Sequence, residues 1–98
     1  MTEINQNGPI LLVEDNPVDL DLTLRALKSQ HLENPILTAR DGEEALAFVE
    51  KWEKGEPRPV VILLDLKMPK VNGLEVLKVL KSHPEYKTIP VVVLTTSS

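Results

Sequence analysis

The chain contains no cysteine and very few aromatic residues. The absence of cysteine excludes disulfides, zinc sites built on thiolates, and cysteine nucleophiles. With one Trp, one Tyr and one Phe, the interior must be built mainly from Leu, Val, Ile and Ala, which supply most of the 42% hydrophobic content. A chain of 98 residues has room for one core only. We therefore expect a single domain over residues 1–98.

The chain also lacks long runs of basic residues and long runs of apolar residues. The 11 basic and 15 acidic residues give a net charge of −4, and no basic cluster interrupts the chain, so direct binding to nucleic acid is disfavoured. The longest apolar run, residues 60–64, is far shorter than the roughly 20 residues of a membrane-spanning helix. The first residues lack the apolar stretch of a secretory signal. These features predict a soluble cytoplasmic protein without membrane contact.

Proline and glycine divide the chain into alternating apolar runs and helical patterns. Continuous apolar runs predict strands at residues 10–13, 60–64 and 91–94. Asn34-Pro35 restarts the chain in an extended conformation and predicts a further short strand, ILTA, at residues 36–39. Helical spacing predicts helices over residues 17–30, over 41–54 before Gly55, and from about Leu74 to a point before Pro84. Asn16-Pro17 provides a cap and a first-turn proline for the first of them. This order predicts an α/β fold: a doubly wound parallel sheet with helices on both faces.

The first predicted helix carries apolar residues in two stripes. Leu22 and Ala26 belong to one stripe, and Leu20 and Leu24 belong to a second stripe that we place beside it. We expect Leu22 and Ala26 to face the sheet. Leu20 and Leu24 would then lie on the flank, available to another helix or to a partner chain.

Carboxylates follow two of the predicted strands. Glu14 and Asp15 come after the first strand and Asp65 after the third, at the sheet edge where parallel α/β folds bind ligands. Taken alone, an aspartate at a strand end is more often a turn former or helix cap. Three carboxylates together repel one another unless a cation neutralises them. Oxygen-only ligands suit Mg²⁺, so these residues predict a magnesium site.

Three segments occur in this order along the chain: ILLVEDNPVD, VILLDLKMPKVNG and IPVVVLTT. Together they resemble the receiver domain of bacterial two-component response regulators. The resemblance implies the flavodoxin-like receiver fold, a five-stranded parallel sheet of order 2-1-3-4-5 with five helices. The NPVD stretch and the linker GEPRP look most like single-domain receivers paired with phytochrome-type kinases.

The resemblance also implies a role for each matching residue. Asp65 would be the phosphoacceptor, taking a phosphoryl group from a sensor histidine kinase. Asp15 would bind Mg²⁺ directly, Glu14 mainly through water, and Lys67 through its backbone carbonyl. Thr95 would be the switch hydroxyl that contacts the phosphoryl group; without the resemblance, a threonine at a strand end would be read as structural.

The resemblance ends early. A complete receiver has a further helix, a fifth strand ending in a lysine, and a last helix, so we expect the chain to be incomplete at its C-terminus. Lys67 and Lys70 are more simply read as exposed loop residues than as replacements for that lysine. With the fifth strand absent, the fourth strand would have an open edge and favour a homodimer or another strand-mediated association.

Two alternatives stay open at this stage. A protein-interaction module that is no longer phosphorylated would fit the absence of the lysine segment. A magnesium-dependent phosphohydrolase fits less well, because such enzymes place an acid two residues after the nucleophile and this chain has Lys67 there. We therefore expect a signalling protein and not an enzyme. His31 and His83 lack partners at metal-ligand spacing and are read as surface residues.

Overall fold

The computed structural model describes residues 8–65 and 73–94, which form alternating strands and helices. The strands are β1 (Ile10–Val13), β2 (Ile36–Ala39), β3 (Val61–Asp65) and β4 (Val91–Leu94). The helices are α1 (Pro17–Ser29), α2 (Gly42–Glu53) and α3 (Gly73–Ser82). Every expected strand and helix is present, with boundaries that differ by one or two residues. None of these helices is long and apolar enough to cross a membrane.

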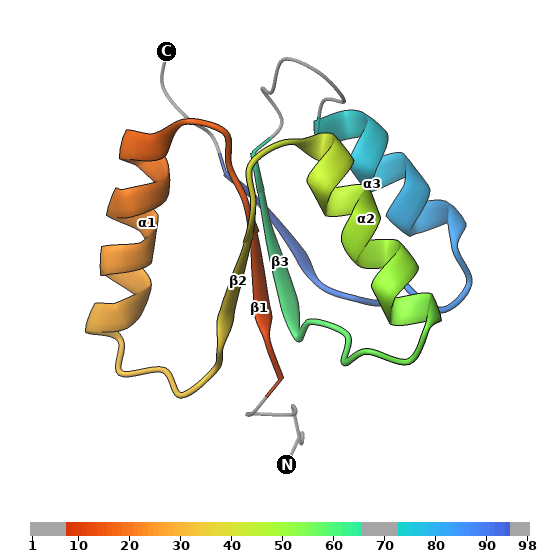
Figure 1. The fold of residues 1–98 in the computed structure, drawn as a ribbon, viewed down its shortest axis with the longest axis horizontal. Coiled ribbons are helices and arrows are strands. Elements are labelled where there is room, and N and C mark those ends of the chain that lie inside the picture. Colours follow the sequence, from red (N-terminus) through yellow and green to blue (C-terminus); the bar gives the residue numbers. More distant parts are fainter. Residues whose placement is uncertain (1–7, 66–72, 95–98) are drawn as a thin grey trace.

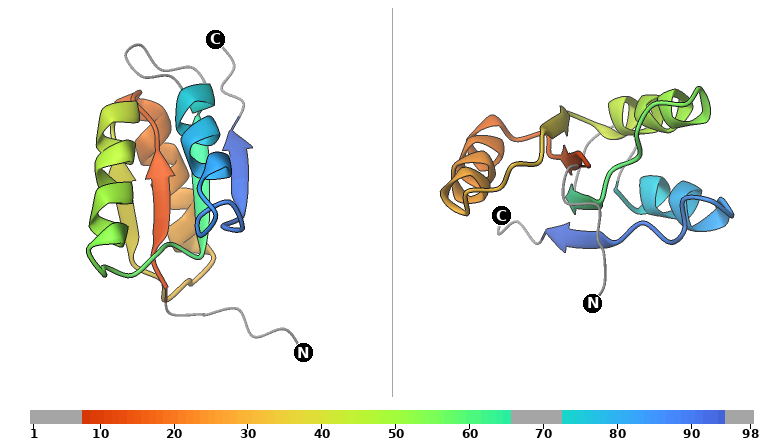
Figure 2. Two further views of the ribbon diagram at one scale, coloured as in Figure 1. Left: turned by 90° about the vertical axis from the view of Figure 1, so that its right-hand side faces the viewer. Right: turned by 90° about the horizontal axis from the view of Figure 1, so that it is seen from below.

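The four strands form one parallel sheet in the order β2-β1-β3-β4. Helix α1 lies on one side of the sheet, and α2 and α3 lie on the other (Figure 1 and Figure 2). The expected doubly wound parallel sheet is confirmed. The strand order also agrees with the first four strands of the receiver order 2-1-3-4-5.

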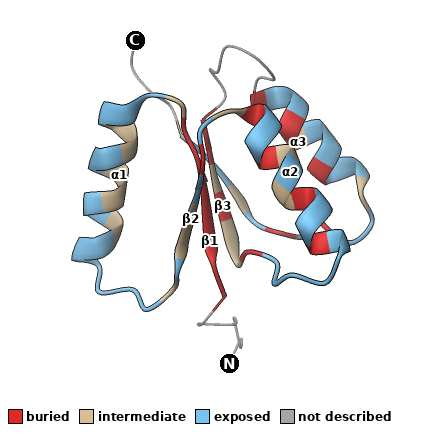
Figure 3. Cartoon of the chain, in the orientation of Figure 1, coloured by how far each residue is buried: buried red, intermediate tan, exposed pale blue. Residues whose placement is uncertain are grey.

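The main core lies between the sheet and the pair α2 and α3 (Figure 3). All four residues of β1 are buried, because this strand has a neighbour on each edge and helices on both faces. The side chains that fill the core belong to the strands, to α2 and α3, and to the segment before β4; they include Leu11, Val13, Val49, Trp52, Ile62, Leu64, Val76, Leu80 and Tyr86. This packing fixes β1 and β3 as the rigid centre of the sheet.

The start of α1 follows the sequence signals. Asn16 is the N-cap: its side chain accepts hydrogen bonds from the backbone N–H groups of Val18 (2.8 Å) and Asp19 (3.1 Å). Pro17 occupies the first turn, where a missing N–H leaves no hydrogen bond unmade. The cap therefore fixes the point at which the chain leaves β1 and turns into α1.

The expected orientation of α1 is wrong. Leu20 and Leu24 are half-buried, whereas Leu22 is 59% exposed, Val18 is 65% exposed, and Ala26 is exposed. The half-buried positions of α1 are on the side of the helix that faces the sheet (Figure 3). At 100° per residue, positions two apart differ by about 200° around the helix, so the two apolar stripes lie on nearly opposite faces and not side by side. Only one of them can pack on the sheet, and the other is left toward solvent.

Helix α1 covers only part of its face of the sheet. Leu12, Leu63 and Val92 lie beside one another on β1, β3 and β4. Leu12 is fully buried, Leu63 is half-buried and Val92 is 48% exposed. Exposure therefore rises toward β4, whose outer edge pairs with no strand in the described part of the chain.

Candidate metal and phosphoacceptor site

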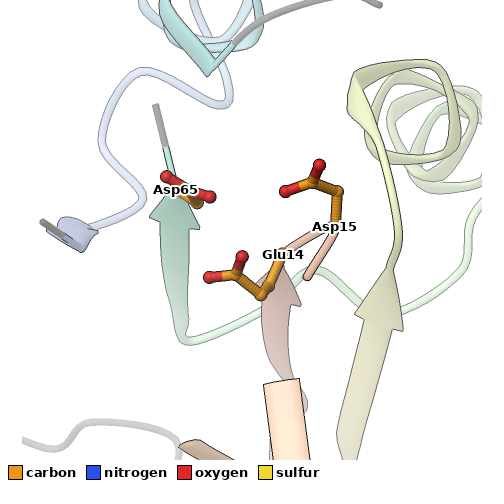
Figure 4. Close-up of side chains that lie close together, drawn as sticks. All are labelled: Glu14, Asp15 and Asp65. Carbon is orange, nitrogen blue, oxygen red and sulfur yellow. The ribbon is translucent and has the colours of Figure 1, made fainter. Parts of the chain in front are cut away.

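The three predicted carboxylates meet at the carboxyl edge of the sheet. Glu14 and Asp15 follow β1 directly, and Asp65 is the last residue of β3. Because Val13 pairs with Leu64 in the parallel register, the residues that come next, Glu14 and Asp65, lie on neighbouring strands. Figure 4 shows the three side chains gathered around one space above the two strands.

The carboxylates are close enough to share one ion. One oxygen from each of Glu14, Asp15 and Asp65 lies within 4.8 Å of the others. Glu14 is 1% exposed and Asp65 is 2% exposed, while Asp15 is half-buried. Two acids are thus withdrawn from water, and the third lies at the entrance.

Glu14 has the most perturbed electrostatics of the three. The pKa of its carboxyl is raised from 4.5 to about 7, and burial is the largest cause, followed by the neighbouring Asp65 and the charge of Asp19. The backbone N–H of Asn16 acts in the opposite direction, donating to Glu14 Oε2 at 3.2 Å. Glu14 Oε1 is buried and has no hydrogen-bond partner among the described residues. A buried carboxylate oxygen without a donor is suited to a cation.

The donor set fits a hard divalent cation. All three side chains offer carboxylate oxygens, the ligand type that Mg²⁺, Ca²⁺ and Mn²⁺ prefer over the nitrogen and sulfur ligands of zinc and copper. A cation here would lower the repulsion between the acids and satisfy Glu14 Oε1. The half-buried Asp15 leaves the site open on one side, as a cation that keeps several waters requires.

Two predicted site residues, Lys67 and Thr95, lie outside the described residues. Leu94, which precedes Thr95 in the sequence, pairs with Asp65 in the β3–β4 register.

The sequence predicted Asn16 only as a helix cap and did not predict that its backbone N–H donates a hydrogen bond to Glu14. The position of Asn16, two residues after the first acid, was the available signal for this contact.

The histidines lie away from the carboxylates. His31 is exposed after α1, as expected. His83 is half-buried and not a plain surface residue: its ring stacks on Tyr86 with 4.0 Å between centroids, and its Nε2 lies 3.4 Å from Glu53 Oε2. Tyr86 is 1% exposed and also packs against Trp52, with 5.3 Å between ring centroids, so the His83 ring that stacks on it loses part of its solvent contact.

The chain matches the family model of the response regulator receiver domain over residues 10–98. It is 46% identical over 97 residues to response regulator Rcp1 of Synechocystis sp. (strain ATCC 27184 / PCC 6803 / Kazusa), an alignment that covers 97% of this chain and 66% of Rcp1. The chain therefore spans just under two thirds of the length of that curated relative.

Solved structures agree with this match. The bacteriophytochrome response regulator AtBRR is 50% identical with a TM-score of 0.85, and the alignment covers 93% of this chain and 68% of AtBRR. The phosphorylated cyanobacterial phytochrome response regulator RcpA is 45% identical with a TM-score of 0.82, covering 93% and 66% of the two chains. The Mn²⁺-bound form of Rcp1 also has a TM-score of 0.82, at 46% identity, covering 91% and 66%. One similar protein has thus been seen phosphorylated and another with a divalent metal.

Proposed function

Because the chain belongs to the response regulator receiver domain family, we propose that it accepts a phosphoryl group on Asp65 from a phosphohistidine of a sensor histidine kinase, with Mg²⁺ held by Glu14, Asp15 and Asp65. The observation that supports this most directly is the meeting of the three carboxylates at one sheet edge, with a buried Glu14 oxygen that has no donor among residues 8–65 and 73–94. The kinase would be of the phytochrome class, by analogy with the relatives that are named as phytochrome response regulators.

The transfer uses Asp65 as a nucleophile. An Asp65 oxygen attacks phosphorus, the bond between phosphorus and the donor imidazole nitrogen breaks, and the imidazole leaves with its electron pair as an acyl phosphate forms on Asp65. Bound Mg²⁺ would offset the repulsion between the carboxylate and the incoming phosphoryl oxygens. Asp65 ends β3, a strand with neighbours on both edges, so the attacking oxygen is held in a fixed position.

The remaining receiver roles belong to the same proposal. The Lys67 backbone carbonyl would be a further metal ligand. The Thr95 hydroxyl would donate to a phosphoryl oxygen and draw the segment after β4 toward the site. The register supports the second role, since Thr95 directly follows the residue that pairs with Asp65.

The exposed stripe of α1 fits contact with the phosphodonor. Val18 and Leu22 present apolar surface to solvent on the helix that begins beside the carboxylates. A kinase that brings its phosphohistidine to Asp65 must cover this end of the domain, so burying these two side chains would add to the binding free energy. We therefore place part of the kinase interface on this stripe.

Phosphorylation with acetyl phosphate and Mg²⁺, followed by intact mass, tests the proposal. The wild type should gain one phosphoryl group and Asp65→Asn none. Asp21→Asn, the same change at an exposed position on α1, is the matched control and should behave as the wild type. Phosphorylation of Asp65→Asn at the wild-type rate would refute the assignment. A folded wild type that is never modified, by acetyl phosphate or by a kinase, would favour the interaction module.

Metal binding is tested separately by titration with Mg²⁺ or Mn²⁺. Asp15→Ala should weaken binding more than any change outside the cluster, because Asp15 supplies a direct ligand at the entrance. Equal affinities for wild type and Asp15→Ala would exclude the direct-ligand role. Binding should also weaken at low pH, as the carboxylates become protonated.

A further inference from the structure

A cavity of about 430 Å³ lies at the opposite end of the sheet from the carboxylates. Gly8 and Pro35, which line it, come before β1 and β2, whereas the carboxylates follow β1 and end β3. Leu37 of β2 and the rings of Phe48 and Trp52 on α2 also line it. Small-molecule sites in proteins have volumes of about 300–1,000 Å³, so this cavity is large enough for a small ligand.

The lining favours an apolar ligand that brings its own hydrogen-bond donors. The described residues around the cavity are mostly aromatic, aliphatic or proline, and proline has no backbone N–H. Among these described residues, the Trp52 indole carries the one side-chain donor and Glu56 the one charge. A phosphate or a carboxylate needs several donors from the protein, so this wall does not match it. A cationic donor on an apolar body does match it.

Glu56 is available to pair with such a cation. It is exposed, and no residue in the described part of the chain forms an ion pair with it. The Lys51 ammonium lies over the Phe48 ring instead, 4.8 Å from its centroid, and Arg58 pairs with Glu85 at 2.6 Å. Because Lys51 would repel a second cation from that face of Phe48, the positive end of a ligand is best placed at the Glu56 carboxylate.

We propose that the cavity binds a small primary amine with an aromatic body, whose ring packs against Phe48 and Trp52 and whose ammonium group pairs with Glu56. Burial of the ring supplies most of the binding free energy, and contact with two aromatic side chains favours an aromatic body over an aliphatic one. The exposed ion pair adds selectivity for positive charge. This inference is independent of the phosphoacceptor role, because the cavity and the carboxylates lie at opposite ends of the sheet.

Titration of the full chain with phenylbutylamine tests the proposal. The protein has one tryptophan, so a change in its fluorescence or in its indole NMR signal reports a ligand in this cavity. Phenylbutanol and phenylbutyrate carry the same ring with a neutral and a negative head group. The amine should perturb Trp52 and saturate, and the alcohol and the acid should bind about fivefold more weakly or less, because an exposed ion pair contributes only this much.

Glu56→Gln removes the proposed partner of the ammonium group. It should weaken binding of phenylbutylamine about fivefold and leave phenylbutanol unaffected. Glu50→Gln is the matched control: it removes the same charge from an exposed position on α2, and at 100° per residue it lies about 200° around the helix from Phe48 and Trp52. It should bind the amine as the wild type does. Both positions are exposed, so both variants should fold.

Four results would overturn the proposal. Trp52 signals that do not respond to millimolar phenylbutylamine would exclude the site. Equal binding of the three probes would show that the cavity selects apolar surface and not positive charge. Equal losses in Glu56→Gln and Glu50→Gln would indicate general attraction of the amine to an acidic protein. Trp52 signals that change with protein concentration alone would identify a second copy of the chain as the occupant.

Discussion

Replacing Glu14 by glutamine should stabilise the metal-free protein by about 3 kcal/mol above pH 7. Burial, together with the nearby Asp65, raises the pKa of the Glu14 carboxyl from 4.5 to about 7. At 1.36 kcal/mol per pKa unit, that difference is a penalty of about 3 kcal/mol for carrying the charge in the folded state. Glutamine keeps the shape and carries no charge, so it removes the penalty.

The pH dependence follows from proton linkage. Between pH 4.5 and about 7 the folded state binds a proton at Glu14 more tightly than the unfolded chain, so the free energy of unfolding falls as pH rises. Below this window both states are protonated and the penalty is absent; above it both are ionised and the penalty is complete. The stability difference between Glu14→Gln and wild type should therefore be small at about pH 4 and reach its plateau above pH 7.

Urea unfolding measures this difference. Trp52 is 5% exposed in the folded protein, so its fluorescence reports unfolding, and a chelator keeps the carboxylates metal-free. Glu50→Gln, at an exposed position on α2, is the control and should show no such dependence. A difference that stays flat from about pH 4 to pH 9, or a glutamine variant less stable than wild type above pH 7, would refute the reasoning. Adding Mg²⁺ should stabilise wild type more than the variant.

Three further predictions concern packing. Leu24→Ala should lower the free energy of unfolding by about 1–2 kcal/mol and Leu22→Ala by less than about 0.5 kcal/mol, because only Leu24 faces the sheet. Urea unfolding measures both losses, and equal losses would contradict the observed orientation of α1. Asn16→Ala should lose about 1 kcal/mol with its two capping hydrogen bonds, and an unchanged melting temperature would show that the cap is dispensable. If the 98-residue chain self-associates through β4, Val92→Lys should shift sedimentation equilibrium at low micromolar concentration toward monomer; a compact wild-type monomer would exclude that association.

The sheet and the convergence of the acids could be predicted because both follow from local patterns. The strands are short, largely apolar runs that end at or just before a polar residue, with Thr38 of β2 as the one polar residue inside a run, so the strand positions and the parallel arrangement leave little freedom. Glu14 and Asp65 then meet because neighbouring parallel strands end at the same edge. The order of strands and helices is therefore enough to predict that these two acids lie at the same edge of the sheet.

The orientation of α1 could not be predicted in the same way. Its two apolar stripes are similar in size, and only the burial of α1 in the structure shows which one is covered. Two further features depend on three-dimensional distances that the sequence does not state: the Glu14 oxygen, which has no hydrogen-bond partner within the described part of the chain, and the cavity lined by Phe48 and Trp52. Sequence patterns thus predicted which residues lie at the same edge of the sheet. They did not predict which face of α1 packs on the sheet, because the two faces have similar hydrophobic content.

The core itself keeps the acidic site unfavourable in the absence of metal. Glu14 directly follows four buried residues of β1, and Asp65 ends a strand with a neighbour on each edge, so neither backbone can move the acids apart without exposing apolar surface. Uncovering even one buried leucine of β1 costs about 1.5–3 kcal/mol, comparable to the penalty at Glu14. The packing of the sheet therefore holds the acids close together, and a bound cation is the least costly way to relieve their repulsion. Stability is given up at the site where the proposed cation would need concentrated negative charge.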